Sequence, residues 1–506
     1  MLARVFAPAQ LGIQSQIISI ECDLSNGLPA FVVDGLADRS VDEAKERVRA
    51  ALRHTNIPIP PKRIVMNLAP ANLPKDGTGF DMGIAVALMA ATGHLQVSTN
   101  NKLFAGEIGL DGTIRAIPGT LSHARAAQQH GLDEIFIPAA NAAEAALCGN
   151  LTIYAVHSVG ELYAHLAGQR LITAYKSRPP SLGSTTAPIV DFANIRGQSR
   201  AKRALEIAAA GGHNIILNGP PGAGKTMLAR ALAGILPPLR FTELVEVNQI
   251  HSAAGLTATG LINTRPFRNP HHTASSVALI GGGQIPRPGE ISLSHHGVLF
   301  MDELPEFPRS VLEVLRQPLE DGRVTIARAS TTVTYPAEFM LVATQNPCPC
   351  GFAGDQQHNC SCRPIQIKRY HQKISGPLLD RIDLHVEVAA ITSRELLTEQ
   401  DAEPTVVIAK RVMAAQLQQQ RRHKNHYIPN ARLTGQQLKQ ICHIDNEAQD
   451  IAEKAITGLK LSARSYVRSL RVARTIADLA GSTNICKEHL VEALQYRALS
   501  DYNKLV

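Results

Sequence analysis

The chain has 506 residues, a formal net charge of +8 and a sequence pI near 9.1. This length is too great for one hydrophobic core and predicts about two to four domains. The apolar fraction of 44% and the charged fraction of 19% exclude a disordered or fibrous protein. We find no apolar run of roughly 18 residues and no signal-peptide pattern, so we expect a cytoplasmic protein without a membrane span. The basic charge agrees with an anionic partner such as nucleic acid.

The first third of the chain alternates strand and helix patterns. They predict strands over residues 13–22, 29–33 and 135–138 and helices over 41–53 and 82–91. A stretch rich in proline, serine, glycine and threonine follows over residues 176–188 and is typical of a linker. We therefore expect an α/β domain over residues 1–172 and a linker over 173–190. The pattern is again α/β to about residue 390 and helical from residue 393 onward.

The most informative motif is a phosphate-binding loop that fits G-x-x-x-x-G-K-[ST] in full. It consists of Gly219, Pro220, Pro221, Gly222, Ala223, Gly224, Lys225 and Thr226. Its glycines let successive backbone N–H groups point at phosphates, while Lys225 reaches the β and γ phosphates and Thr226 ligates Mg²⁺. A strand pattern over 213–218 precedes it and a helix pattern over 227–233 follows it. The chain is therefore predicted to bind ATP or GTP.

Two further strand patterns end in polar residues suited to nucleotide hydrolysis. The strand over 297–301 ends at Asp302, which would hold water ligands of Mg²⁺, and Glu303, which would orient and deprotonate the attacking water. The strand over 339–344 leads to Asn346, which is placed to hold that water near the γ-phosphate. The alternative for Asn346 is a turn-forming residue before a proline.

Four clustered cysteines suggest a metal. Cys348, Cys350, Cys360 and Cys362 form two C-x-C pairs around a short polar loop. We predict a structural, tetrahedral Zn²⁺ site, with a redox pair or four ordinary thiols as the alternatives. The adjacent histidines His271 and His272, elsewhere in the chain, have no carboxylate at helical spacing. We therefore expect loop structure or subunit contacts there instead of a metal site.

The order of these motifs resembles an AAA+ ATPase. The strings at residues 265–273 (RPFRNPHHT) and 291–296 (ISLSHH) are similar to the magnesium-chelatase-like branch, and in particular to the ComM (YifB) family. The resemblance covers essentially the whole chain. It implies a mixed α/β fold with an AAA+ core over 191–392, a Cys-rich insert at 347–363 and a helical lid over 393–506.

The resemblance also implies roles for single residues. Asp302 and Glu303 correspond to the Walker B acids and Asn346 to the first sensor, with ATP and Mg²⁺ as cofactors. Arg381 resembles an arginine finger that reaches the ATP of a neighbouring subunit, which implies a ring, a homo-hexamer. The second sensor is expected at Arg464, with Arg471 as the runner-up. For most of the later lid arginines, including Arg468 and Arg474, we expect only a basic helix face.

Residues 270–290 and 320–329 are too long to be plain connections, and the second, with its Asp-Gly pair, is predicted to form a β-hairpin. In this branch of AAA+ proteins such inserts project into the ring pore. Arg323 and Arg328 are our candidates for contacts to DNA phosphates. A solvated hairpin or a subunit contact is the alternative reading.

The N-terminal region resembles the proteolytic domain of Lon proteases (ribosomal S5 domain 2-type) in residues 74–81 and 106–112. A serine nucleophile and a lysine base would be required. The nucleophile position holds Gly79, and the expected lysine at 117–121 is absent. We therefore expect no peptidase activity and a domain kept for assembly or DNA contact, in which Asp76 and Asp81 only cap turns.

The family resemblance implies an ATP-driven hexameric motor on single-stranded or branched DNA, which promotes branch migration during homologous recombination and natural transformation. The alternative is a protein-remodelling ATPase of the magnesium-chelatase type. A third reading is an ATP-dependent protease, and the missing serine and lysine argue against it.

Overall fold

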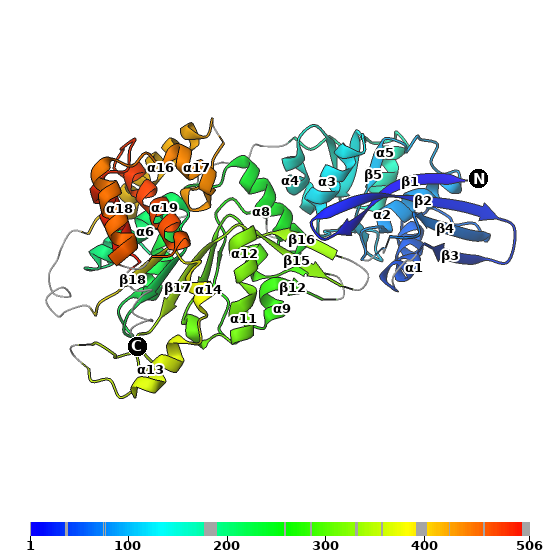
Figure 1. Cartoon of the computed structure of the whole chain (residues 1–506). Helices are drawn as coiled ribbons and strands as arrows, with labels where there is room; N and C mark the ends of the chain where they lie inside the picture. The colour runs from blue at the N-terminus through cyan, green and yellow to red at the C-terminus, as the bar shows by residue number, and fades with distance from the viewer. Residues whose placement is uncertain are drawn as a thin grey trace.

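The computed structural model describes residues 2–35, 39–73, 75, 77–176, 190–257, 260–283, 286–328, 332–355, 358–390, 402–424, 426–458 and 461–497. Most of the predicted linker, the predicted start of the lid, Pro74 and Asp76 lie outside these residues. Figure 1 shows an elongated chain, with an N-terminal domain at one end, a central sheet, and a bundle of helices at the other end. None of the described helices combines the length and the apolarity needed to cross a bilayer.

The N-terminal domain is built on a seven-stranded mixed sheet of order β3-β4-β2-β1-β5-β8-β9. The sequence analysis missed β1, which pairs antiparallel with β2 through a tight turn at Gly12, where φ is +63°. Helix α2 is buried along almost its whole length between this sheet and α1. The strands are β1 Ala3–Leu11, β2 Gln14–Ser25, β3 Ala30–Asp34, β4 Arg63–Ala69, β5 Lys102–Phe104, β8 Glu134–Pro138 and β9 Thr152–Val156, with a small β6 Glu107–Ile108 and β7 Ile114–Arg115 pair. The helices are α1 Arg39–His54, α2 Asp81–Ala91, α3 Thr120–Gln129, α4 Ala142–Ala145 and α5 Val159–Leu166.

The central sheet has five strands in the order β11-β14-β17-β10-β18, and every neighbouring pair is parallel. Its strands are β10 Ile215–Asn218, β11 Phe267–Arg268, β14 Val298–Met301, β17 Met340–Gln345 and β18 Leu384–Glu387. Because all five run the same way, the sheet has one carboxyl edge, where the strands end, and one amino edge, where they begin. Ligands of open parallel sheets bind outside the carboxyl edge.

Helices of the central region cover this sheet and the insertions. They are α6 Ser199–Gly211, α7 Lys225–Ile235, α8 Phe241–Ala253, α9 Ser276–Ile280, α10 Glu290–Leu293, α11 Arg309–Val314, α12 Arg316–Asp321, α13 Pro364–His371 and α14 Gly376–Leu379. Short strands β12 Gly281–Gly282 and β13 Arg287–Pro288 pair antiparallel beside α9.

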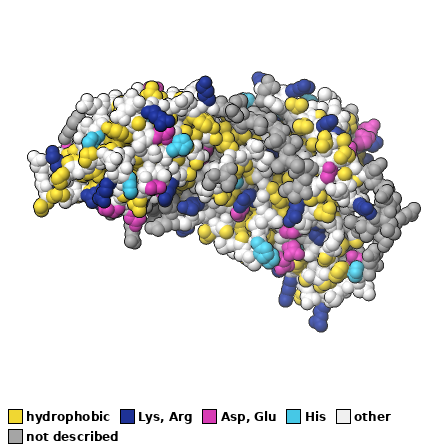
Figure 2. Space-filling model, turned by 180° about the vertical axis from the view of Figure 1, so that it is seen from behind, with side chains coloured by type: hydrophobic (Ala, Val, Ile, Leu, Met, Phe, Trp, Pro, Cys, Tyr) yellow, Lys and Arg dark blue, Asp and Glu magenta, His cyan; other side chains and the backbone are white. Residues whose placement is uncertain are grey.

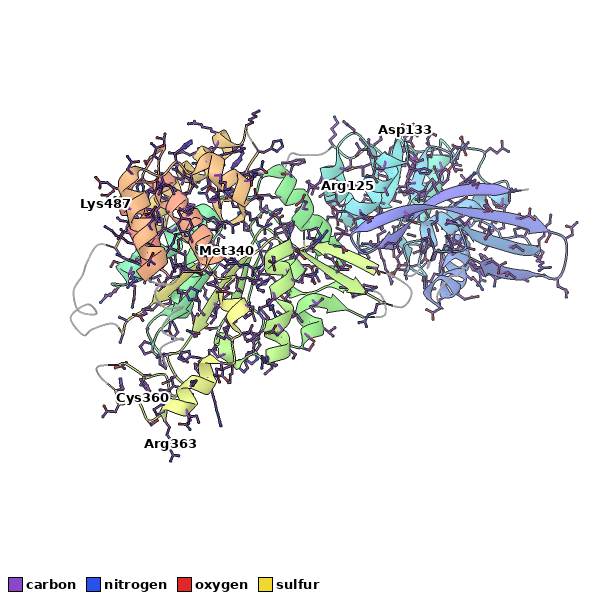
Figure 3. The ribbon with its side chains drawn as sticks, in the orientation of Figure 1. Arg125, Asp133, Met340, Cys360, Arg363 and Lys487 are labelled. Atoms are coloured by element: carbon purple, nitrogen blue, oxygen red, sulfur yellow. The ribbon has the colours of Figure 1, made fainter. Side chains whose placement is uncertain are left out.

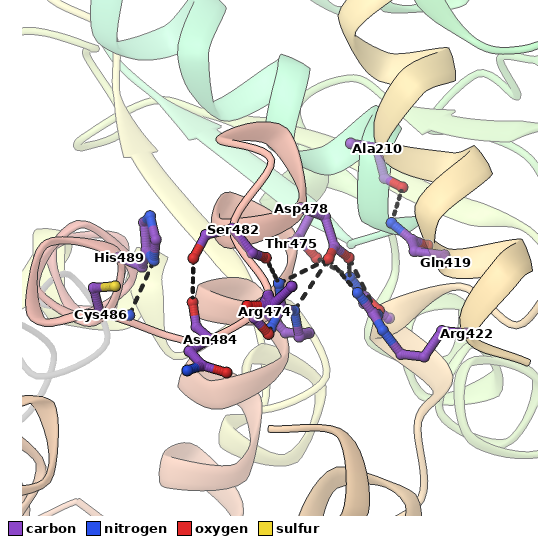
Figure 4. Close-up of polar contacts among 12 residues, drawn as sticks. Ala210, Gln419, Arg422, Arg474, Thr475, Asp478, Ser482, Asn484, Cys486 and His489 are labelled. Atoms are coloured by element: carbon purple, nitrogen blue, oxygen red, sulfur yellow. Dashed lines mark hydrogen bonds and ion pairs between the residues drawn. The ribbon is translucent and has the colours of Figure 1, made fainter. Parts of the chain in front are cut away.

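The helical lid shares a hydrophobic core with the central sheet. Apolar side chains of β10 and β18 pack through α6 and α7 onto the lid helices, including Ile408, Val412 and Ile476. Figure 4 shows one polar contact of this junction, in which Gln419 of the lid donates to the Ala210 carbonyl of α6 at 3.0 Å. It also shows Arg422 and Arg474 binding Asp478 within the lid. The lid consists of α16 Thr405–Arg422, α17 Gly435–Ile441, α18 Asn446–Gly458, α19 Ala463–Leu479 and α20 Lys487–Gln495.

The N-terminal domain is fixed to the central region through α3 and α8. Leu121 packs in an apolar cluster with Leu244 and Val247 of α8. The buried Glu144 carboxylate accepts hydrogen bonds from the Ser252 hydroxyl and, at 3.0 Å, from Thr257. Burial raises the pKa of Glu144. Since apolar and buried polar contacts both cross this junction, the two domains meet at a specific interface.

The predicted hairpin exists, but its turn is not at the Asp-Gly pair. Gly322 ends α12 in a left-handed conformation with φ +66°, and β15 Arg323–Ala327 then pairs antiparallel with β16 Thr332–Pro336. Asp-Gly therefore serves as a helix C-terminus, where glycine is equally favoured. One face of the hairpin is buried, and its Val333 lies against Gly12 of the N-terminal domain. The other face, which carries Arg323, is exposed.

Candidate nucleotide site

The phosphate-binding loop joins β10 to α7, as predicted. Gly222 and Gly224 have φ of +79° and +85°, a region that only glycine enters easily. A side chain on Gly219 would meet the Val388 carbonyl oxygen at 2.2 Å. The loop thus requires glycine at all three positions, and it presents the N-terminus of α7 to an anion.

Lys225 and Asn346 meet at the carboxyl edge. The Lys225 ammonium donates to the Asn346 side-chain oxygen at 3.0 Å and to the carbonyls of Gly219 at 2.6 Å and Pro220 at 2.8 Å. Burial lowers the pKa of Lys225, although the nearby Asp302 and Glu303 act in the opposite direction. The lysine expected at the phosphates and the amide expected at the attacking water are therefore in contact, although Lys225 begins α7 and Asn346 follows β17.

A hydroxyl and a carboxylate suited to Mg²⁺ lie beside this pair. The Thr226 hydroxyl donates to Asp302 at 3.2 Å. Both residues were predicted as the magnesium contacts, and hard oxygen ligands are what Mg²⁺ prefers. The residues present therefore fit an ATP–Mg²⁺ complex, which would be held by the loop amides, Lys225, Thr226 and Asp302.

Thr344 is a functional residue that the sequence analysis missed. Its hydroxyl donates to Asp302 at 2.5 Å and accepts from the Glu303 backbone N–H at 2.8 Å. Glu303 is exposed and has a left-handed φ of +53°, a strained conformation for glutamate. Thr344 on β17 thus fixes both acids that follow β14. A threonine inside an apolar strand carries no local signal for this role.

Arg381 lies at the opposite edge of the same sheet. Its carbonyl accepts from Asn214, the residue before β10, at 3.0 Å, whereas the phosphate-binding loop follows the far end of β10. A strand of this length separates the two edges by on the order of 10 Å. The Arg381 side chain is 14% exposed and pairs with Glu320 of its own chain. The arrangement directs Arg381 away from its own nucleotide site.

The lid arginines divide into two groups. Arg464 is exposed at the start of α19, and the hydrogen bond from Arg381, with the charges of Arg381, Arg464 and Arg468, lowers the pKa of Glu320. Arg464 therefore shares the amino edge with Arg381. The later residues do not form a basic face: Arg471 donates to the Leu433 carbonyl at 2.6 Å, and Arg474 is fully buried on Asp478. The expectation of a basic helix face is wrong for Arg474, because its charge is neutralised inside the lid.

The four clustered cysteines converge. The Cys348 Sγ lies 3.3 Å from the Cys350 Sγ and 3.6 Å from the Cys360 Sγ, and Cys362 completes a set within 4.8 Å. Tetrahedral Zn–S bonds of about 2.3 Å place sulfurs about 3.8 Å apart. Hydrogen bonds from the Phe352 backbone N–H and the Cys348 thiol lower the pKa of Cys350 to about 5, whereas burial and the neighbouring thiols raise the pKa values of Cys360 and Cys362. The donor set fits a structural metal, and zinc itself stays a prediction.

A second cluster of potential ligands, which contains two histidines, does not fit a metal site. Glu246 accepts from His295 at 3.1 Å and from His296 at 2.8 Å. The other ring nitrogen of His295 accepts from the Glu338 backbone N–H at 2.9 Å, so the nitrogen facing Glu246 carries the proton and cannot ligate a cation. His271 bonds to Thr273 at 2.9 Å, in agreement with a loop role.

The basic residues of the inserts differ in availability. Arg323 and Arg328 are both exposed. Arg265 binds Glu243 at 2.8 Å, and Arg268 binds Glu290 with two bonds of 2.6 and 2.7 Å. Those two arginines stabilise the insert internally. DNA contact by Arg323 and Arg328 stays a prediction.

In the N-terminal domain, Asp81 has more than a capping role. Its buried carboxylate accepts from Arg47 at 2.7 and 2.9 Å and from the Ile108 N–H at 3.1 Å. The expectation that turn capping accounts for Asp81 is therefore wrong, because its ion pair with Arg47 joins α1 to α2 and its hydrogen bond from Ile108 adds β6.

Known proteins match this sequence along nearly its whole length. The family described as "Magnesium chelatase, subunit ChlI" matches residues 191–396, "Subunit ChlI of Mg-chelatase" matches 20–141, and "Magnesium chelatase, subunit ChlI C-terminal" matches 402–497. The chain is 41% identical over 505 residues to the competence protein ComM of Haemophilus influenzae, covering 98% of each protein. The chain belongs to the ComM/YifB family of magnesium-chelatase-like AAA+ proteins.

Another member of the family and a more distant relative also match this chain. YifB of Salmonella typhimurium is 42% identical over 503 residues, covering 98% of this chain and 97% of that protein. The magnesium-chelatase 38 kDa subunit of Rhodobacter capsulatus is 25% identical over 332 residues, covering 62% of this chain and 88% of the subunit. Membership of the ComM/YifB family implies ATP and Mg²⁺ at the site described above.

Proposed function

We propose that the chain is an ATP-driven DNA motor, which assembles as a hexameric ring and promotes branch migration during homologous recombination and natural transformation. The observation that carries the proposal is the division of the ATPase machinery between the two edges of the central sheet. The name of the Haemophilus influenzae relative, a competence protein, supports a role in the uptake or integration of DNA.

The carboxyl edge accounts for binding and hydrolysis. ATP bound with Mg²⁺ supplies the phosphoryl group that is transferred to water. Lys225 and the loop amides hold the phosphates, and Thr226 and Asp302 hold the cation. Glu303 accepts a proton from the attacking water, which Asn346 orients.

The amino edge accounts for assembly. Arg381 and Arg464 lie there without a phosphate site of their own chain, so each acts on the nucleotide of a neighbouring copy. An arginine supplied in trans contributes about 10³–10⁵ to turnover in related phosphoryl transfers. Hydrolysis therefore depends on a closed ring in which each amino edge meets a carboxyl edge.

DNA is favoured as the polymer over a protein substrate. Exposed Arg323 and Arg328 offer phosphate contacts, and the full-length identity is to a competence protein, whereas the magnesium-chelatase subunit aligns with only part of this chain. A protein-remodelling ATPase of the magnesium-chelatase type remains the second candidate. We expect the cysteine cluster to hold a structural Zn²⁺ and the protein to act in the cytoplasm.

The test is ATP hydrolysis by the purified protein with and without a synthetic three-stranded or four-way DNA junction, together with displacement of a labelled strand. We expect DNA to stimulate hydrolysis and displacement to require ATP. Hydrolysis that no DNA stimulates would favour the protein-remodelling candidate.

A further inference from the structure

One part of the chain stands out by its charge. We call residues 347–355 and 358–374, which comprise the cysteine cluster and α13, the Cys arm. Between Asp355 and Asp380 the sequence contains four arginines and lysines and no acidic residue. On the face shown in Figure 2, basic side chains elsewhere are interspersed with acidic ones, whereas basic side chains stand out at the lower end, where the arm projects.

The arm turns one basic face to solvent. Ile365, Lys368 and Arg369 follow the spacing of one helix face, and all three are exposed, Ile365 by 57%. Arg363, just before the helix, is exposed too and lies at the tip of the arm in Figure 3. Neither Arg363 nor Arg369 has an ion-pair partner within the part of the chain that the structure describes. An amphipathic helix whose outer face carries only positive charge fits a polyanion.

The inner face of α13 is attached to the nucleotide site. The Tyr370 side chain is buried, and burial raises its pKa although the Asn346 backbone N–H acts in the opposite direction. The His371 ring donates at 3.0 Å to the carbonyl of Pro347, the residue directly after Asn346. Burial lowers the pKa of His371, so the ring is neutral and this nitrogen is the donor.

Two more contacts join the arm to other parts of the site. Gly351, between the cysteines, lies so close to Pro221 of the phosphate-binding loop that a side chain there would meet the proline ring at 2.5 Å. Lys373 pairs at 3.3 Å with Glu306, which follows the Walker B acids. The arm therefore touches the phosphate-binding loop, the Asn346 segment and the Walker B segment.

We propose that the Cys arm binds the phosphate backbone of nucleic acid through Arg363, Lys368 and Arg369 and transmits this binding to the ATPase site through His371 and Gly351. The proposal rests on the proposed DNA motor and names a contact that the hairpin does not supply. The phosphates of single-stranded and duplex DNA offer the same chemistry. The cysteine cluster keeps the arm rigid, so that DNA binding at the basic face is transmitted to Asn346 and Pro221.

The first experiment compares the variant R363A/K368A/R369A with K410A/K439A/K454A, which removes the same charge from exposed lid positions. Fluorescence anisotropy with labelled single-stranded DNA and with a duplex is measured over a series of salt concentrations. We expect the arm variant to bind single-stranded DNA about tenfold more weakly and to lose about 2 units of the slope of log K against log salt. DNA should no longer stimulate its ATP hydrolysis, whereas the lid variant should behave as the wild type.

Mass photometry and zinc content show whether the arm variant assembles and keeps its fold. An arm variant that forms rings and retains both the salt slope and the stimulation would overturn the proposal. Loss of rings in the arm variant alone would also overturn it, because the face would then be a subunit contact. If DNA neither binds nor stimulates the wild type, the proposed function itself fails.

The transmission step has its own test, since His371 lies on the inner face. We expect His371→Ala to keep the DNA affinity and lose most of the stimulation by DNA. His371→Gln retains an N–H donor for the Pro347 carbonyl and should restore it. Full stimulation in His371→Ala would exclude this route.

Discussion

The two edges of the central sheet differ in what a single chain supplies to the proposed ATPase site. At the carboxyl edge, Lys225, Asn346, Thr226 and Asp302 are already joined by hydrogen bonds within one chain. At the amino edge, Arg381 is held by Glu320 and has no phosphate-binding loop of its own chain beside it. Under the role proposed for Arg381, a single chain is prepared for nucleotide binding, whereas its hydrolysis requires a second copy.

The largest loss of function at the carboxyl edge is expected from a substitution in the phosphate-binding loop. Lys225→Ala removes the ammonium that contacts the phosphates, so we expect loss of both ATP binding and measurable hydrolysis. Equilibrium binding of a fluorescent ATP analogue and phosphate release check the two effects. Lys410→Ala, on the lid surface, serves as the control. Wild-type hydrolysis in Lys225→Ala would refute the assignment of the site.

The role proposed for the amino edge is tested by a substitution at Arg381. Arg381→Ala should lower turnover by about 10³-fold and leave ATP binding intact. Glu303→Gln should be inactive for the separate reason that it lacks the base, with a loss of about 10²–10⁴-fold.

A mixture of these two inactive variants sharpens the comparison. In rings formed from equal amounts, about one quarter of the interfaces combine an intact Glu303 with an intact Arg381 from the neighbour. Phosphate release should therefore recover to a substantial fraction of wild type after mixing. No recovery, in rings shown to be mixed, would contradict an arginine that acts in trans.

The amino edge also contains a buried ion pair that joins the sheet to the lid. Asp383 accepts from His213 at 3.1 Å and lies 3.9 Å from Arg468. Burial alone would raise the pKa of Asp383, but the hydrogen bond and charge of His213 and the charge of Arg468 hold it below the usual range. Asp383→Asn should lower the free energy of unfolding by about 3 kcal/mol near neutral pH.

The pH dependence of that effect follows from the lowered pKa. The stabilisation by Asp383 is fully present above the ordinary aspartate pKa and is lost as the pH falls through the lower folded-state value. Urea unfolding of the wild type and Asp383→Asn should therefore differ at pH 7 and converge in acid. A difference that stays constant down to pH 3 would show that the carboxylate charge is not responsible.

At the carboxyl edge, the Cys arm offers a metal test. We expect the purified protein to contain about one zinc per chain, and Cys360→Ser to lose it and unfold at a temperature lower by several degrees. Cys486→Ser, outside the cluster, is the matched control. Zinc analysis by mass spectrometry and thermal unfolding measure both effects. A wild type that folds fully without metal would favour ordinary thiols.

The smallest expected effect concerns the hairpin rooted at the amino edge. Arg323→Ala and Arg328→Ala should each lower the slope of log K against log salt for DNA by about 1, with no change in ATP binding. Thr325→Ala on the same exposed face is the uncharged control. Unchanged slopes in both arginine variants would leave the hairpin as a subunit or domain contact.

The sequence predicts the parts of the site that depend on local spacing. The loop of residues 219–226 and the acids after β14 were located correctly, because glycine geometry and a strand ending in carboxylates are local patterns. Thr344 was missed, since its role depends on β17 lying beside β14, which no spacing within the chain reveals. The edge position of Arg381 likewise follows from the parallel order of β10 and β18.

The fold shows the same limit. The chain pattern predicted α1, α2, β3 and β8 well, but it missed β1, because that strand is recognisable only through its pairing with β2. The Asp-Gly pair was interpreted as a hairpin turn although it ends α12, since both structures favour the same residues. Asp81 was assigned a local cap because its partner, Arg47, lies on another helix.

The contact between Arg381 and Glu320 has a consequence for a newly made subunit. Under the proposed ring mechanism, a chain that binds ATP before it meets other copies keeps Arg381 paired with Glu320 and holds the nucleotide without cleaving it. In that mechanism ATP is hydrolysed only where rings form, so the concentration of the protein itself would set the threshold at which hydrolysis begins.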